Sequence, residues 1–240
     1  MEWTGEGTVI ARRRHGETAA ILTVLTPDQG LMSGVVPGAT SQRRAAMLQP
    51  GARLTLRWRA RLHDQLGTFV AEPIRTRPGL MTDPDALAGL NAVSALLAYA
   101  LPERDPHPRL AARTESLLDA MDAGGAWWSG YLGWELLLLD ELGFGLQLHR
   151  CAVTGDTTGL AYVSPRTGHV VTAAAAGDWA PRLLRLPGPL GGPDGGLAEA
   201  LAVTGHFLDA HLAQGQIGRP LPAARARLIR RLQRRPDAAD

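Results

Sequence analysis

The chain has 240 residues, a formal net charge of +2 and 45% hydrophobic residues. This length is sufficient for one or two domains with a buried core, and the composition is that of a globular protein rather than a disordered or fibrous chain. The single cysteine, Cys151, excludes an internal disulfide and fits a reducing compartment, so we expect a cytoplasmic protein. The first residues lack a signal-peptide pattern, and the most apolar run, residues 131–148, contains acids; we therefore expect no membrane partner.

The chain contains arginine but no lysine, and its arginines are unevenly distributed. Arginines outnumber acidic residues over residues 1–80, whereas acidic residues outnumber arginines over residues 81–240. The stretch 219–235 is again basic and contains no acid. Two basic regions that flank an acidic middle indicate a nucleic acid or another anionic surface as a partner.

Residues 3–75 have the pattern of β-strands. Apolar or β-branched segments bounded by turn residues predict five strands, at residues 3–10, 19–26, 31–36, 53–62 and 66–74, with a turn near His63 and Asp64. Ser41 to Leu48, between the third and fourth strands, predicts one or two helical turns. This layout is typical of the oligonucleotide-binding (OB) barrel, whose sheet face and loops bind single strands, although other small barrels share it.

The fourth predicted strand, residues 53–62, has two different faces. Leu54, Leu56 and Trp58 alternate with arginines, so one face is apolar and the other basic. Alternate residues lie about 7 Å apart, within the Debye length of about 8–10 Å, and these arginines repel one another unless an anion lies across them. A row of phosphates would fit, and a solvated sheet face is the alternative. The arginines of this region that we predict to contact nucleic acid, including those of a basic loop at residues 12–17, are Arg12, Arg13, Arg14, Arg43, Arg44, Arg57, Arg59 and Arg61.

Beyond a linker predicted at residues 75–84, the hydrophobic period changes to that of helices. Helices are expected at residues 85–101, 109–123, 126–142, 197–212 and 222–235, with a hairpin at 153–171 that turns at 165–168. We therefore predict an α+β protein, with an OB-fold domain at residues 1–78 and a mostly α-helical domain at residues 79–240.

The last predicted helix carries a second basic surface. Ala224, Leu228 and Leu232 recur at i, i+4 and i+8 and predict a buried stripe. The remaining surface is basic, and a solvated helix face is the alternative to a contact with nucleic acid. The contacts predicted here are Arg225, Arg227, Arg230 and Arg231.

The chain contains none of the common catalytic or nucleotide-binding motifs, so we predict no catalytic residue and no enzyme activity. Cys151 with His149 and His169 could form a thiol nucleophile or part of a zinc site. A structural zinc site needs four ligands, and Thr154 stands where a Cys-x-x-Cys partner would be. We therefore expect no metal and no cofactor. The aromatic residues of the first domain, Trp3, Trp58 and Phe69, lie on apolar faces and are expected in the core, so binding should be electrostatic.

Short motifs follow one another along the chain in the order Glu6-Gly7-Thr8-Val9-Ile10, Gly16-Glu17, Trp134-Glu135-Leu136, Leu142-Gly143-Phe144, Cys151-Ala152-Val153-Thr154-Gly155, Tyr162-Val163-Ser164-Pro165-Arg166-Thr167-Gly168, Leu184-Arg185-Leu186-Pro187, Thr204-Gly205-His206-Phe207-Leu208 and Leu221-Pro222-Ala223-Ala224-Arg225. In this order and spacing they resemble the motifs of the RecO family of bacterial DNA repair proteins, over about residues 1–235.

The resemblance implies an N-terminal OB domain and a helical domain with a zinc-finger-like hairpin insert, here at about residues 149–172. Some members of the family hold zinc in this insert with four cysteines. Only Cys151 is present here, so we expect the insert to fold without metal around Tyr162, Val163 and Val171.

The resemblance also implies a recombination mediator of the RecF pathway that binds single- and double-stranded DNA and anneals complementary strands. The implied protein partners are RecR, the C-terminal tail of single-strand binding protein and, indirectly, RecA, and the implied location is the cytoplasm, with nucleoid association during repair. The alternative from a different class is an OB-fold RNA-binding module.

Overall fold

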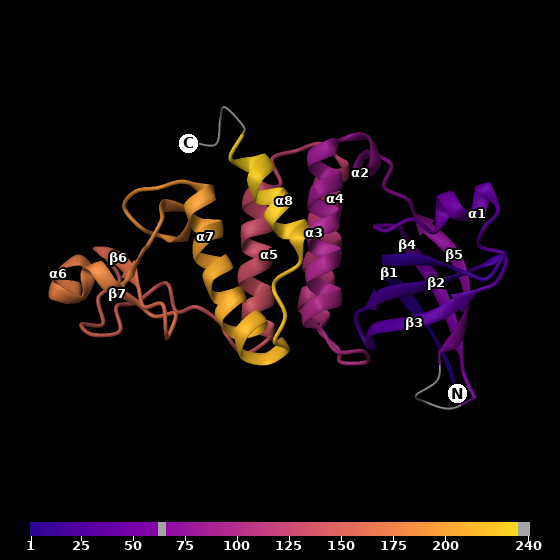
Figure 1. The fold of residues 1–240 in the computed structure, drawn as a ribbon, viewed down its shortest axis with the longest axis horizontal. Coiled ribbons are helices and arrows are strands. Elements are labelled where there is room, and N and C mark those ends of the chain that lie inside the picture. Colours follow the sequence, from indigo (N-terminus) through magenta and orange to yellow (C-terminus); the bar gives the residue numbers. More distant parts are fainter. Residues whose placement is uncertain (62–65, 235–240) are drawn as a thin grey trace. The chain divides into compact units, whose positions relative to one another are not determined.

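The structure is a computed structural model that describes residues 1–61 and 66–234. Two compact units divide the chain, residues 1–125 and 126–240 (Figure 1). The predicted turn near His63 and Asp64, Leu62 at the end of the predicted strand, and Arg235 at the end of the last predicted helix lie outside the described residues.

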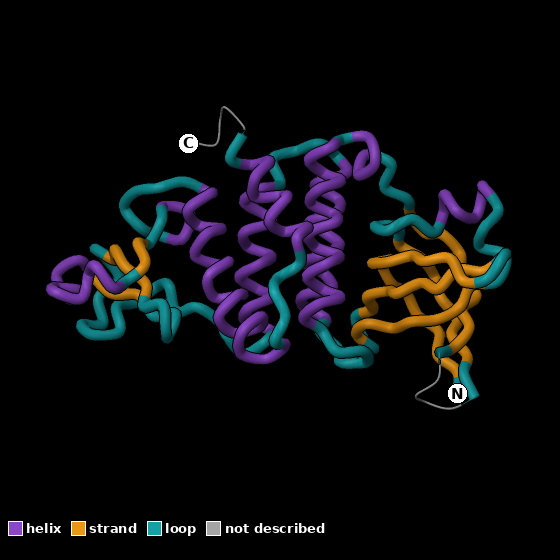
Figure 2. The backbone as a smooth tube through the Cα atoms, in the orientation of Figure 1, coloured by secondary structure: helices purple, strands orange, loops and turns teal. Residues whose placement is uncertain are grey.

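Five strands of the first unit form a closed barrel in the order β1-β2-β3-β5-β4 (Figure 2). The strands and the one helix inserted between the third and fourth are β1 (Glu2–His15), β2 (Ala19–Thr26), β3 (Gly30–Val36), α1 (Gln42–Met47), β4 (Arg53–Arg59) and β5 (Gly67–Arg75). The predicted five-stranded barrel with a helical insert is therefore confirmed, and this arrangement fits an OB fold.

Alternation along the strands fills the barrel with apolar side chains. Leu54, Leu56 and Trp58 of β4 point into the core, as predicted, together with Phe69 of β5. The barrel closes where Gly34 pairs with Gly67, and a Cβ at either position would overlap one of these two aromatic rings. Glycine is required there because two strands and two rings share the space.

Trp3 differs from the other two aromatic residues of the barrel, which are buried as expected. It is half-buried, packs against the edge of the core and donates a hydrogen bond from Nε1 to Asp28 Oδ2 at 2.9 Å. Its polar edge therefore stays at the surface.

The predicted basic loop at residues 12–17 is wrong for residues 12–15, because β1 continues to His15, and Gly16 and Glu17 lie in the turn that follows. Arg12 and Arg14 pair with Leu22 and Ala20 of β2, after a register shift between Val9 and Ala11. Such a bulge bends a strand and lets it follow the curvature of a barrel. Three successive arginines do not alternate with apolar residues, so the sequence pattern did not reveal the backbone pairing.

Helices α2 (Gly79–Thr82), α3 (Pro84–Ala100) and α4 (Pro108–Asp122) complete the first unit. Asp83 caps α3, since its Oδ1 accepts hydrogen bonds from the backbone N–H groups of Asp85 and Ala86. The predicted linker thus contains a short helix. Contacts of α3 with β1 and of α4 with β2 place both helices in the first compact unit. A domain boundary between residues 78 and 79 stays a prediction.

The second unit combines helices with a small sheet of order β7-β6-β8. Its elements are α5 (Trp128–Glu141), β6 (Leu160–Val163), β7 (Val170–Thr172), α6 (Ala173–Ala176), the 3-10 segment η1 (Gly177–Arg182), β8 (Leu184–Arg185), the 3-10 segment η2 (Gly188–Leu190), α7 (Leu197–Phe207), the wider helical segment η3 (Leu208–Ile217) and α8 (Ala223–Leu232). The predicted hairpin corresponds to β6 and β7, whereas β8 was not predicted.

The core of the insert differs from the expected one. Val163 and Val170 are fully buried, whereas Tyr162 and Val171 are half-buried. Tyr162 and Val171 are paired across β6 and β7, and they lie on the opposite face from the buried valines because side chains alternate along each strand.

Candidate nucleic-acid interface

Arg77 is the most buried arginine of the first unit, with 1% of its side chain exposed. Its Nε donates to Asp119 Oδ1 at 2.7 Å and its Nη2 to Glu115 Oε2 at 2.9 Å, while Nη1 bonds the carbonyl of Gly51. Burial acts to lower the pKa of Arg77, but the two carboxylates outweigh it and raise that pKa. Arg77 therefore holds the end of the barrel against α4 and is not available to a ligand.

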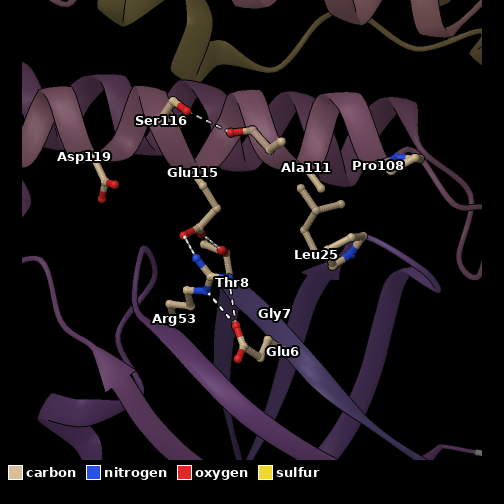
Figure 3. A pocket seen from close by; sticks show the side chains of 12 residues that line it. Glu6, Gly7, Thr8, Leu25, Arg53, Pro108, Ala111, Glu115, Ser116 and Asp119 are labelled. Carbon is tan, nitrogen blue, oxygen red and sulfur yellow. Dashed lines mark hydrogen bonds and ion pairs between the residues drawn. The ribbon is translucent and has the colours of Figure 1, made fainter.

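A second group of paired charges lines a cavity of about 370 Å³ between β1, β4 and α4 (Figure 3). Arg53 contacts Glu6 Oε2 at 2.7 Å and Glu115 Oε2 at 3.5 Å, and the Thr8 hydroxyl also bonds Glu115. Leu25 and Pro108 form part of the apolar side of this cavity. Since Arg75 pairs with Asp119 of α4 at 2.8 Å, the arginines at positions 53, 75 and 77 all have acidic partners.

The arginine row of β4 faces outward, as predicted. The sequence pattern also predicted that no acid lies near these arginines, and this prediction is wrong. Arg57 and Arg59 both contact Glu2 Oε1, at 3.9 and 3.0 Å. The sequence of β4 alone does not reveal this counter-charge, because Glu2 comes from β1, which pairs with β4 in the barrel. Exposed pairs contribute only about 0–1 kcal/mol, so a phosphate can still displace this shared carboxylate. Arg61 is exposed and lines a shallow hollow with Glu2 and Arg59.

The remaining arginines of the barrel lie in the last residues of β1 and the first turn of α1; we call this set the basic rim. It consists of Arg12, Arg13, Arg14, Arg43 and Arg44. Arg12 Nη2 donates to the carbonyl of Ala39 and Arg44 Nη1 to that of Pro37, both at 3.0 Å. Both guanidinium groups are therefore fixed on the same short stretch of backbone. Among residues 1–61 and 66–234, no carboxylate forms an ion pair with any member of the rim.

Part of the β2–β3 face, where OB folds often bind their ligands, is covered by the chain between α3 and α4. The backbone N–H of Arg104 donates to the carbonyl of Leu31 at 2.9 Å, and Ser33 Oγ donates to Glu103 Oε1 at 2.6 Å. The Arg104 guanidinium lies 4.6 Å from the centre of the Trp58 ring. A strand of nucleic acid cannot lie along this part of the face while these contacts persist. No pattern in the sequence predicted that residues 103 and 104 cover it.

The buried stripe predicted for α8 is confirmed, since Ala224, Leu228 and Leu232 are buried. The prediction that Arg225 lies on the exposed surface is wrong. Its Nε and Nη2 bond the two carboxylate oxygens of Glu135, each at 2.8 Å, and Glu135 is fully buried. Arg225 follows Ala224 directly and lies at the edge of the buried stripe, so its side chain reaches inward. The sequence feature that could have predicted this ion pair is Glu135 itself, an acidic residue within the apolar run of α5.

The other predicted arginines of α8, Arg227, Arg230 and Arg231, are exposed, so this helix does present a basic face. Neither aromatic residue at the start of α5 belongs to that face. Trp127 is buried and Trp128 half-buried, with their rings stacked at 4.2 Å.

Two family models together match nearly the whole chain. The model described as "Recombination protein O N terminal" matches residues 1–77, and the one described as "Recombination protein O C terminal" matches residues 81–234. The chain belongs to the RecO family.

Relatives with the printed name "DNA repair protein RecO" are similar to the chain along its length. The protein from Paracoccus denitrificans is 65% identical over 233 residues, which cover 97% of this chain and 96% of the relative. Those from Roseobacter denitrificans and Cereibacter sphaeroides are 52% and 53% identical, with 98% of this chain and 100% and 99% of the relatives covered. The recognition made from short motifs is thereby confirmed.

The zinc site that some RecO family members hold does not fit the residues of this insert. The Cys151 sulfur is buried and accepts hydrogen bonds from the backbone N–H groups of Thr154 and Thr172, both at 3.4 Å. Bonding by Thr154, above all, lowers the pKa of the Cys151 thiol to about 6, against the opposing effect of burial. His149 and His169 line a hollow with Cys151, but the described residues contain no cluster of three His, Cys, Asp or Glu able to hold a metal.

We predict that protein purified without chelator contains less than one-tenth of an equivalent of zinc, because one cysteine cannot supply the four ligands of a structural site. Elemental analysis by mass spectrometry measures this directly. A zinc content of one per chain that is lost in a Cys151→Ala variant would contradict the prediction and would make His149 and His169 the candidate ligands.

In the described ranges, every helix falls short of the length and apolarity that a membrane span requires.

Proposed function

We propose that this protein is a DNA-binding recombination mediator that acts without catalysing a covalent step. In this proposal it binds single- and double-stranded DNA and anneals complementary strands. With RecR, it helps to load RecA onto DNA coated by single-strand binding protein, in the RecF pathway of repair. Membership of the RecO family over both halves of the chain supports a role in DNA repair and recombination.

The observation that carries DNA binding is the basic rim. Arginine binds phosphate through two parallel hydrogen bonds, so a cluster of arginines suits a phosphate backbone of any sequence. Arg12 Nε is buried and has no hydrogen-bond partner within the described part of the chain. This solvent-excluded donor is out of reach of a phosphate oxygen, so the phosphate contacts of the rim would come from its exposed guanidinium groups. Arg13, Arg14 and Arg43 are exposed and have no acidic partner among residues 1–61 and 66–234.

The arginine row of β4 and the basic face of α8 support two further contacts. Arg57, Arg59 and Arg61 would extend the barrel surface, at a cost set by displacement of Glu2. Arg227, Arg230 and Arg231 would form a separate surface on the second unit. Two basic surfaces on one chain would let it hold two strands for annealing, or hold DNA with one and the acidic tail of single-strand binding protein with the other.

The proposal is tested by the affinity of the protein for single-stranded DNA, duplex DNA and RNA of equal length over a salt series, with annealing of complementary strands measured in parallel. We expect submicromolar binding of single-stranded DNA at low salt. The logarithm of the binding constant should fall linearly with the logarithm of salt concentration, by about 0.7 per neutralised phosphate. Tighter binding of RNA than of DNA, or no acceleration of annealing, would contradict the proposal and favour an RNA-binding module.

A further inference from the structure

Trp179 is the most exposed tryptophan in the described residues, with 63% of its surface exposed. It lies in η1, a segment of the second unit that contributes no buried residue. An indole ring is among the largest apolar groups of a protein, and exposing it contributes nothing to the core. The fold itself therefore gives no reason for a tryptophan at this position.

The backbone holds Trp179 on a short turn that is anchored at both ends. Gly177 ends α6 with φ of 46°, a conformation that side chains disfavour, and the chain turns sharply there. After Pro181, the backbone N–H of Leu183 bonds the carbonyl of Ala180 at 3.2 Å, and β8 then pairs with β6. The ring is thus presented from a fixed position rather than from a long loop.

The segment of the chain that contains the ring is basic, and Arg182 is the arginine in contact with it. The Arg182 guanidinium carbon lies 5.1 Å from the centre of the Trp179 ring. Arg185, the second residue of β8, is exposed, as are Arg150 and Arg166 earlier in the segment. The acids of residues 149–186 are Asp156, which accepts a hydrogen bond from Thr154, and Asp178. Arginines therefore outnumber acids in this segment, and the attraction is toward an anionic partner.

We propose that Trp179 and Arg182 form a stacking site for the bases of single-stranded DNA. This inference rests on the proposed function and adds a contact that is distinct from the phosphate contacts of the basic rim. An aromatic ring beside an arginine matches the way proteins bind single strands, with a base stacked on the ring and the guanidinium adding cation–π or phosphate contact. Bases in a duplex are already stacked on their neighbours, so this site would favour single strands.

The test measures fluorescence anisotropy with a labelled oligothymidine, an abasic oligonucleotide of equal length and charge, and a duplex. Trp179→Ala should weaken binding of oligothymidine about tenfold and leave the abasic strand and the duplex within twofold of the unchanged protein. The salt dependence should keep its slope, because no phosphate contact is lost. Trp179→Phe, which keeps an aromatic face, should recover most of the affinity.

Val153→Ala is the matched control, since Val153 is another exposed apolar residue of the second unit, and it should change none of the three affinities. Unchanged circular dichroism establishes that the variants fold. If the unchanged protein binds oligothymidine but Trp179→Ala binds it equally well, the stacking site is wrong and the proposed function stands. If the unchanged protein binds no single strand, the proposed function itself fails. Equal losses on the abasic strand and on oligothymidine would also overturn the stacking site, because the ring would then not act through the bases.

Discussion

Replacing Arg225 by methionine will lower the free energy of unfolding of this protein by about 3–5 kcal/mol, because Glu135 is then left buried without its cation. Both oxygens of Glu135 bond the Arg225 guanidinium at 2.8 Å, and Thr204 Oγ1 donates to Oε2 at 2.5 Å. Burial acts to lower the pKa of Arg225, and Glu135 raises that pKa overall, so Arg225 keeps its positive charge in the folded protein.

The double variant Glu135→Met, Arg225→Met separates the cost of an orphaned charge from the contribution of the pair. An apolar replacement of both partners removes the desolvation penalty, and we expect it to recover at least half of the lost stability. The control is Arg227→Met on the exposed face of α8, which should change stability by less than about 0.5 kcal/mol. Urea unfolding followed by circular dichroism measures all three, with the slope compared among variants because the chain has two compact units. An Arg225→Met loss below 1 kcal/mol would contradict the buried geometry.

This ion pair also illustrates what the sequence did and did not reveal. Alternation in β4 and the spacing of Ala224, Leu228 and Leu232 identified buried faces correctly, because such patterns report local geometry. Arg225 lies beside the α8 stripe, and its burial depends on Glu135, a residue 90 positions away. Contacts between residues so far apart in the chain depend on how the helices pack, and the periodicity of a sequence does not report that packing.

The candidate interface shows the same limit. Strand patterns and turn residues were enough to predict the barrel and its helical insert. They did not predict which surface arginines have an acidic neighbour, because that depends on which strands pair. Glu2 faces Arg59 only because β1 and β4 are neighbours. Likewise, Glu103 and Arg104 cover Leu31 and Ser33 through contacts between distant segments. The sequence therefore identified the arginines of the barrel surface, but only the structure shows which of them form ion pairs with acidic residues.

Neutralising the basic rim should weaken binding of single-stranded DNA about 100-fold at 0.1 M salt. The variant is Arg13→Gln, Arg14→Gln, Arg43→Gln, which leaves in place Arg12 and Arg44, the two members bonded to the backbone at Ala39 and Pro37. Each phosphate contact to a single strand contributes about 0.7 to the slope of the logarithm of the binding constant against that of salt concentration. Three lost contacts reduce the slope by about 2. Because counterion release vanishes near 1 M salt, that change corresponds to about two decades of affinity at 0.1 M.

The matched control is Arg57→Gln, Arg59→Gln in the same barrel. These two arginines share the carboxylate of Glu2, so their combined positive charge is already reduced by one. We expect the slope to fall by no more than about 1 and the affinity at 0.1 M salt by no more than about tenfold. Both variants change exposed side chains, and circular dichroism and thermal unfolding should be unchanged.

The comparison of the two variants decides which arginines carry the phosphate contacts. A larger slope change for the β4 pair than for the rim would show that phosphate displaces Glu2 and that the strand row is the main surface. A loss of affinity without any change in slope would mean that the rim acts other than by neutralising phosphates. With the expected order, the path of the DNA backbone is placed at the end of β1 beside α1, away from the part of the β2–β3 face that Glu103 and Arg104 cover.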